Sequence, residues 1–163
     1  MSSDTSSPSL RPPKPGTRFV LPALHGAAEA LVLAQAARTL KDEGRMIVVV
    51  VADAPAAQRL LAEINWFGKR HAQGNDPTEA HAKAPTKAPP DMPADGLRCH
   101  LLPDWETLPY DAFSPHQDLV SERLSTLYRI QRGDFDVAVV PAQTALVRLC
   151  PPAYLAARTF FLA

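Results

Sequence analysis

Three carboxylates, Asp104, Glu106 and Asp111, lie within one short stretch of the sequence. Paired carboxylates can transfer protons or hold a metal ion. The surrounding residues, 103–115, include three prolines among aromatic side chains, which indicates a structured loop. Acidic groups in such loops are more often solvated or used as helix caps. We therefore assign no catalytic residue and no metal ligand to this stretch.

A second candidate for chemistry is the stretch from Leu21 to Ala30, which leads into a predicted helix. A phosphate-binding loop, G-x-x-x-x-G-K-[ST], uses glycines to close its amides around phosphates, a lysine to neutralise charge and a hydroxyl to hold magnesium. If Gly26 marks a glycine of an ancestral loop, Glu29 stands in place of the lysine and Ala30 in place of the hydroxyl. A carboxylate there repels a triphosphate, so we expect no nucleotide cofactor. The plain alternative is that Gly26 only begins a helix.

The other reactive side chains show no catalytic spacing. Cys99 and Cys150 are far apart and form no CxxC or Cys/His pattern, and the histidines lack the spacing of zinc ligands. His116 lies near the start of a predicted helix, where we interpret it as structural. The sequence therefore predicts no metal site.

Composition indicates a single cytoplasmic domain kept in a reducing compartment. The chain has 163 residues, 46% of them hydrophobic, with 17 basic and 17 acidic side chains. A formal charge of zero gives no argument for binding to nucleic acid or to a membrane surface. The longest apolar run, residues 46–52, is too short to span a bilayer. Two cysteines are fewer than a secreted disulfide scaffold would usually carry.

Proline is unusually frequent, at 17 residues, and is concentrated in two regions. Residues 1–17 and 70–96 have almost no large apolar side chains, so both are predicted to be disordered. The ordered domain is then residues 18–163, interrupted by the insert at 70–96.

The ordered part alternates between predicted strands and predicted helices. Strands are expected at residues 18–22, 46–52, 97–102, 135–140 and 158–162. Helices are expected at residues 26–40, after Asp53, from a Ser114 cap to Gly133, and at residues 144–149. The β-branched run 46–52 does not alternate, which is typical of a strand buried on both faces. This order predicts an α/β fold with a doubly wound parallel sheet.

The helix after Ser114 has a defined predicted cap and core face. Ser114-Pro-His-Gln117 fits a capping box, in which the serine and the glutamine satisfy the first backbone amides. Val120, Leu124 and Leu127 recur at helical spacing, and we expect them to face the core.

One long segment resembles a known family. It runs Asp104-Trp-Glu-Thr-Leu-Pro-Tyr-Asp111, continues as Phe113-Ser-Pro-His-Gln-Asp118 and reaches Arg123-Leu-Ser-Thr-Leu-Tyr128. It resembles the N-terminal region of bacterial transcription-repair coupling factors (Mfd), and the likeness extends over residues 18–163 apart from the insert. The motif residues that we single out as possible contacts are Asp104, Trp105, Glu106, Pro109, Tyr110, Asp111, Phe113, Ser114, Pro115, His116 and Arg123.

The resemblance implies a three-layer sheet of the P-loop NTPase or RecA-like type. The family's N-terminal region is similar to the excision-nuclease subunit UvrB, but its phosphate loop is degenerate, and Gly26, Glu29 and Ala30 fit that pattern. Full-length members are implied to release RNA polymerase stalled at DNA lesions by ATP- and magnesium-dependent translocation on double-stranded DNA. They are also implied to recruit nucleotide excision repair through UvrA.

The motor and recruiter-binding modules of the family are expected after Ala163, so we expect this chain to be a fragment that catalyses nothing alone. Its expected function is that of a scaffold or interaction region whose partners are other modules of the same protein. Two alternatives stay open: a small nucleotide hydrolase, and a truncated remnant with part of its core exposed. The sequence also leaves open whether Trp105, Tyr110 and Phe113 fill the core or form a contact surface.

Overall fold

The fold is an alternation of helices and strands, seen in a computed structural model that describes residues 10, 16–18, 20–21, 23–72, 96–105, 107 and 111–158. In chain order the elements are α1 (Ala28–Asp42), β1 (Ile47–Val51), α2 (Ala54–Ala72), β2 (Cys99–Leu101), α3 (Gln117–Arg132), β3 (Val137–Pro141), α4 (Ala142–Ala145) and α5 (Pro152–Arg158). The predicted α/β class is confirmed.

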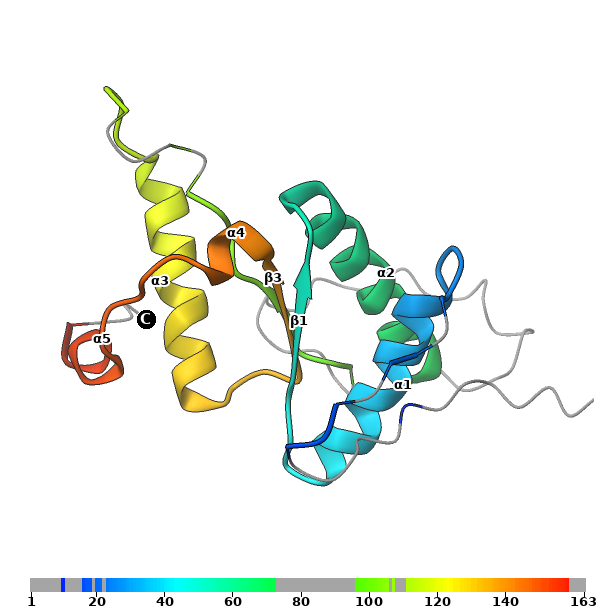
Figure 1. The fold of residues 1–163 in the computed structure, drawn as a ribbon. Coiled ribbons are helices and arrows are strands. Elements are labelled where there is room, and N and C mark those ends of the chain that lie inside the picture. Colours follow the sequence, from blue (N-terminus) through cyan, green and yellow to red (C-terminus); the bar gives the residue numbers. More distant parts are fainter. Residues whose placement is uncertain are drawn as a thin grey trace, which may run out of the picture.

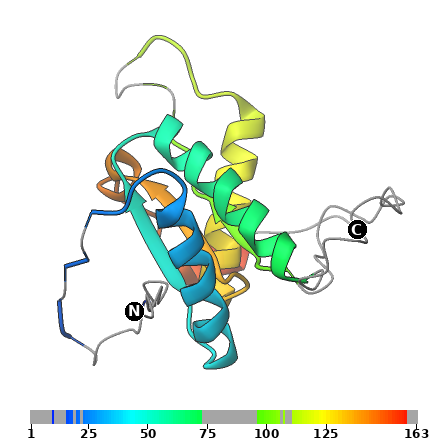
Figure 2. The ribbon, with the colours of Figure 1, turned by 90° about the vertical axis from the view of Figure 1, so that its right-hand side faces the viewer.

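The three strands form a parallel sheet in the order β1-β3-β2. Val139 of β3 is aligned with Val49 of β1 on one side and with Leu101 of β2 on the other. Helices α1 and α2 lie on one side of the sheet, while α3 lies on the other with α5 beyond it (Figure 1). The view turned by 90° shows the same arrangement, with α1 and α2 in front and α3 behind (Figure 2).

The core lies between the sheet and the pair α1–α2. Ala30, Ala34 and Ala37 line one face of α1, and their small side chains allow close packing against α2. Their buried neighbours in this cluster are Ala57, Leu60, Ile64, Leu97, Val137 and Val139. Every residue of β3 is buried, as expected for the central strand of a sheet covered on both sides.

Two glycines end helices as the sequence predicted. Gly44 after α1 and Gly133 after α3 both have φ of 68°, a left-handed conformation that a side chain would strain. The amide of Gly44 donates to the carbonyl of Lys41 (2.9 Å), and that of Arg45 donates to the carbonyl of Leu40 (2.8 Å). This pair of bonds is a Schellman motif, which satisfies carbonyls that the helix leaves unpaired.

The predicted start of α2 is also confirmed. The Asp53 carboxylate accepts a hydrogen bond from the Ala56 amide at 2.8 Å, which is the geometry of an N-cap. The helix continues to Ala72, past residue 70, where the sequence placed the beginning of a disordered insert.

The first expected strand, residues 18–22, is not found. Arg18, Val20 and Leu21 belong to no strand, and Val20 is 85% exposed, whereas Phe19 and Pro22 lie outside the described residues. A short apolar run is a weak signal for a strand, because periodicity over so few residues cannot distinguish a strand from other structure. The expected strand at 158–162 lies outside the described residues except for Arg158, which ends α5, a helix that the sequence did not predict.

Strand β1 was expected to be buried on both faces, and this is wrong. Ile47, Val49 and Val51 are half-buried against the core, but Val48 and Val50 are each 58% exposed. The reason is position. Among the described strands β1 lies at the edge of the sheet, and α3 is anchored to the chain that leaves β2 at the opposite edge.

Two expectations for α3 are also corrected. Its N-cap is His116, whose ring Nδ1 accepts from the Asp118 amide, so Ser114 is not the cap and the helix begins at Gln117. The buried residues of α3 are Arg123 and Thr126, whereas Leu124 is 40% exposed. The apolar spacing was right in part, because Val120 and Leu127 are half-buried, but the side chains that contact the chain after β2 are the polar Arg123 and Thr126.

Candidate functional site

The carboxyl end of the sheet brings together motif residues from the loop after β2 and two polar residues of α4. In parallel α/β sheets this end is where ligands usually bind. Asp104 follows β2 and accepts a hydrogen bond from the hydroxyl of Thr144 at 2.9 Å. The side-chain amide of Gln143 donates to the other carboxylate oxygen. Asp104 therefore ties the β2 loop to the turn that leaves β3.

Arg123 anchors α3 to the same loop. The residue is 2% exposed, its guanidinium lies 4.6 Å from the centre of the Trp105 ring, and Nη1 donates to the carbonyl of Pro103. Nη2 is buried and has no hydrogen-bond partner. Burial lowers the pKa of the guanidinium below its ordinary value, and the nearby charge of Asp104 opposes this shift. The hydroxyl of Thr126 donates to the carbonyl of Leu101 (3.3 Å), one turn further along α3.

These contacts determine what the motif can do chemically. The Asp104 carboxylate and the Arg123 guanidinium both bind groups of the domain itself. Within the described ranges, no three His, Cys, Asp or Glu side chains are grouped to hold a metal ion. The motif residues seen here thus position the loop, α3 and α4 relative to one another.

The rest of the motif faces outward or lies outside the described residues. Phe113 is 81% exposed, and Asp111 and Ser114 are also exposed. Pro115 is half-buried, and His116 caps α3 as the structural interpretation suggested. Glu106, Pro109 and Tyr110 are not among the described residues. The two described aromatic residues of the motif therefore lie in different environments. Trp105 packs inside the domain on Arg123, and Phe113 is exposed to solvent.

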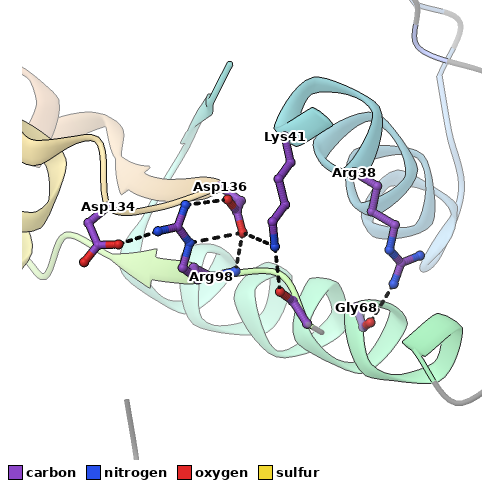
Figure 3. Close-up of polar contacts among 7 residues, drawn as sticks. Arg38, Lys41, Gly68, Arg98, Asp134 and Asp136 are labelled. Atoms are coloured by element: carbon purple, nitrogen blue, oxygen red, sulfur yellow. Dashed lines mark hydrogen bonds and ion pairs between the residues drawn. The ribbon is translucent and has the colours of Figure 1, made fainter. Parts of the chain in front are cut away.

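A second polar cluster, at the amino end of the strands, was not predicted from the sequence (Figure 3). Asp136 precedes β3, and its side chain is only 3% exposed. Its carboxylate accepts from the Arg98 amide (2.7 Å) and from Arg98 Nη2 (2.9 Å), and lies 3.4 Å from Lys41 Nζ. Arg98 also pairs with Asp134, and Lys41 donates to the carbonyl of Gly96 at 3.2 Å. The cluster joins α1, β2 and β3.

Opposing effects act on Asp136. Burial alone raises the pKa of its carboxyl, but the hydrogen bonds and charge of Arg98, together with Lys41, outweigh burial and leave the pKa below its ordinary value. Burial also raises the pKa of the neighbouring Cys99 thiol to about 12, with a contribution from the Asp136 charge. A signal was present in the sequence: a charged residue in each of two predicted apolar strands, Arg98 and Asp136, indicates a buried ion pair.

Nearby, Arg38 of α1 donates to the carbonyl of Gly68 (Figure 3). It also donates, at 3.3 Å, to the carbonyl of Phe67. These bonds join α1 to α2 close to the amino-end cluster and add to the alanine contacts between the helices.

The expected phosphate-loop positions lie around the start of α1. Gly26 is in an exposed turn, and Ala27 caps the helix without a side-chain hydrogen bond. Glu29 is exposed in the first turn, whereas Ala30 is fully buried in the core. Packing in the core therefore explains the small apolar side chain at position 30 without reference to a phosphate loop.

The parallel sheet with helices on both sides makes this chain an α/β domain whose two sheet ends are held by polar clusters. None of the helices formed by the described residues is long and apolar enough to cross a membrane. No protein-family model matches the sequence.

Two curated proteins are similar in sequence to this chain. It is 34% identical over 144 residues to the transcription-repair-coupling factor of Escherichia coli (strain K12), covering 88% of this chain and 10% of the relative. It is 54% identical over 55 residues to the transcription-repair-coupling factor of Haemophilus influenzae, covering 34% of this chain and 5% of that relative. The chain belongs to the transcription-repair-coupling factor family and spans about a tenth of the length of the longer match.

Proposed function

We propose that this chain is a scaffold and interaction region of a transcription-repair coupling factor, equivalent to the family's N-terminal region, and that it has no catalytic centre of its own. One observation carries the proposal. Asp104 and Arg123, the charged motif residues whose contacts are described, hold the β2 loop, α3 and α4 together instead of facing a substrate. The sequence relation to coupling factors supports the first part of the proposal, that the chain is a region of such a factor.

The function of the whole protein is part of the proposal. The full-length factor releases RNA polymerase stalled at DNA lesions by ATP- and magnesium-dependent translocation on double-stranded DNA, and recruits excision repair through UvrA. In this account the present region frames the recruiting module and helps to hold the motor in its resting state. Its own partners are the other modules of the same protein.

The fold type also belongs to the proposal: a P-loop NTPase or RecA-like sheet whose phosphate loop has degenerated at Gly26, Glu29 and Ala30. The exposed Glu29 in the first turn of α1 supports this view. A helix amino terminus favours anions, and a carboxylate in its first turn already occupies that favourable field.

A binding experiment tests the scaffold role. The 163-residue chain is titrated by calorimetry into a coupling factor from which the matched region has been deleted. Saturable one-to-one binding is expected. A Phe113→Ser variant should bind at least about tenfold more weakly if the exposed motif loop makes the contact. Val20→Ser, at a side chain that is 85% exposed but outside the motif, is the matched control. No binding at roughly 100 μM would remove the scaffold proposal.

A further inference from the structure

Helix α1 binds the chain on both sides of the insert through two cationic side chains that lie one turn apart. Where the insert begins, Arg38 donates to the carbonyl of Gly68 near the end of α2 (Figure 3). Where the insert ends, Lys41 donates to the carbonyl of Gly96 at 3.2 Å. Because residues three apart lie on the same side of a helix, one face of α1 binds both ends of the insert.

The two ends of the insert also pack against each other. Gly68, Gly96 and Leu97 are all buried. A Cβ placed on Gly68 would lie 3.7 Å from the Cβ of Leu97, which is ordinary van der Waals contact, so the backbone of α2 lies directly against Leu97. Leu97 belongs to the buried cluster between the sheet and the pair α1–α2. The chain that enters the insert and the chain that leaves it therefore meet at the core.

Both cations are suited to hold a fixed point of the chain. A cation near the carboxyl end of a helix is favoured by the helix dipole, and Arg38 supplies that charge to α2. Lys41 is itself held by the Asp136 carboxylate, which lies 3.4 Å from its ammonium group. Each contact with an insert end is made to a backbone carbonyl. The contacts therefore depend on the path of the chain and not on which side chains the insert carries.

We propose that Arg38 and Lys41 form a clamp that fixes both ends of the insert on the core, so that the fold does not depend on the chain between Ala72 and Gly96. This property is separate from the scaffold role, because it concerns how the domain accommodates additional chain. With both ends fixed, the insert adds only the closure entropy of a longer loop, which grows slowly with length, and places no strain on α2 or β2.

Shortening the insert tests the proposal. Residues 73–95 of the 163-residue chain are replaced by Gly-Ser-Gly-Ser. Four extended residues span about 13 Å, and the end of α2 at Ala72 lies only about 6 Å along the helix from Gly68, so this linker reaches Gly96. Urea denaturation followed by circular dichroism should give a midpoint equal to or above that of the unaltered chain, because a shorter loop costs less closure entropy. A lower midpoint, or loss of the helical signal, would overturn the proposal.

A double-mutant comparison tests Arg38. In the unaltered chain, Arg38→Met should lower the urea midpoint by about 0.5 M, because the end of α2 loses its charged donor. In the short-linker chain the loss should be at most about half as large, since the linker itself then holds α2 near Gly96. Arg59→Met, at an exposed pair on α2, is the control and should have the same small effect in both chains. Equal losses from Arg38→Met in the two chains would show that Arg38 only joins α1 to α2, and would overturn the clamp.

A cut within the insert tests Lys41. The recognition sequence of a site-specific protease replaces residues 80–86, and size-exclusion chromatography follows the cut chain over a dilution series. The two pieces should remain together at roughly 10 μM. Lys41→Met should weaken their association at least about tenfold, because its contacts with Gly96 and Asp136 both cross between the pieces. Arg45→Met, which removes an exposed pair with Glu43 inside the first piece, should leave association unchanged. Pieces that separate without any substitution, or no effect of Lys41→Met, would overturn the proposal.

Discussion

The two ends of the sheet are held by polar clusters that handle a buried charge in different ways. At the amino end, the buried Asp136 carboxylate is matched by two cations, Arg98 and Lys41. At the carboxyl end, the buried Arg123 contacts an aromatic ring and a backbone carbonyl, and one of its nitrogens has no partner. The first charge is well compensated by its neighbours, and the second is only partly compensated.

The cluster that is easier to recognise in the sequence is not the one that we expect to contribute more to stability. The carboxyl-end cluster belongs to a motif that stands out in the sequence, whereas the amino-end cluster is formed by scattered residues. Yet a fully paired buried charge depends more on each partner than a partly paired one does, because loss of a partner exposes the full cost of burial. We therefore expect the inconspicuous cluster to matter more for stability.

The largest effect is expected from Arg98→Met. It leaves the buried Asp136 carboxylate with Lys41 and the backbone amide of residue 98 as partners but without the guanidinium, and should lower the free energy of unfolding by about 3 kcal/mol. Urea denaturation monitored by circular dichroism measures the loss. Arg59→Met, which removes an exposed pair with Glu63, is the control and should change the free energy of unfolding by less than about 0.5 kcal/mol. Equal losses in the two variants would contradict the large contribution to the free energy of unfolding that we assign to the amino-end cluster.

A smaller loss is expected from Thr144→Val, which keeps the shape of the side chain but removes its hydroxyl. The Asp104 carboxylate then loses one hydrogen bond and keeps that from Gln143, so we expect a cost of about 1–2 kcal/mol in the same assay. No change would show that Asp104 does not hold α4.

Arg123→Met should cost less, within about 1 kcal/mol of the unsubstituted chain. Methionine can occupy the space under Trp105, and the substitution removes a buried, incompletely paired charge. If denaturation showed a loss as large as that of Arg98→Met, the contrast between the two ends would be wrong.

The pH dependence should follow the amino-end cluster. The folded pKa of Asp136 lies below its unfolded value, so the stabilisation is present above the unfolded pKa and is lost as pH falls through the folded one. Acid titrations followed by circular dichroism should therefore show a shallower loss of stability below about pH 4 in Asp136→Asn than in the unsubstituted chain. Identical acid profiles would show that Asp136 is not the source of the loss of stability at low pH.

The smallest expected effect concerns thiol reactivity. A pKa of about 12 leaves almost no thiolate on Cys99 near pH 8, so alkylation at this cysteine should be much slower than that of a free thiol. Mass spectrometry after a timed iodoacetamide pulse measures the modified fraction. Because the Asp136 charge contributes to this shift, Asp136→Asn should speed the reaction at Cys99, and an unchanged rate would argue against that contribution.

Local patterns in the sequence predicted much of the fold. Gly44, Gly133 and Asp53 mark helix ends through backbone chemistry that acts within a few residues, and these predictions are confirmed. Burial of β1 and the core face of α3 depend on where distant elements pack. For these two features the predictions from the sequence differ from the structure. Among the described strands β1 lies at the edge of the sheet, where Val48 is exposed, and the order of the strands carries no local signal in the sequence.

The candidate site was predicted in part for the same reason. The motif drew attention to Asp104, Trp105 and Arg123, but the partners Gln143 and Thr144 lie some 40 residues away and carry no local signal. Capping by His116 in place of Ser114 shows how two neighbouring polar residues can compete for one helix end. The degenerate phosphate loop at Gly26 and Glu29 stays a prediction.

Titration of the chain with a fluorescent ATP analogue in the presence of magnesium tests the central claim most directly. If the region is a scaffold without a nucleotide site, fluorescence should show no saturable change up to about 1 mM analogue. Saturable binding in the micromolar range that disappears when magnesium is chelated would contradict the account and favour a nucleotide hydrolase.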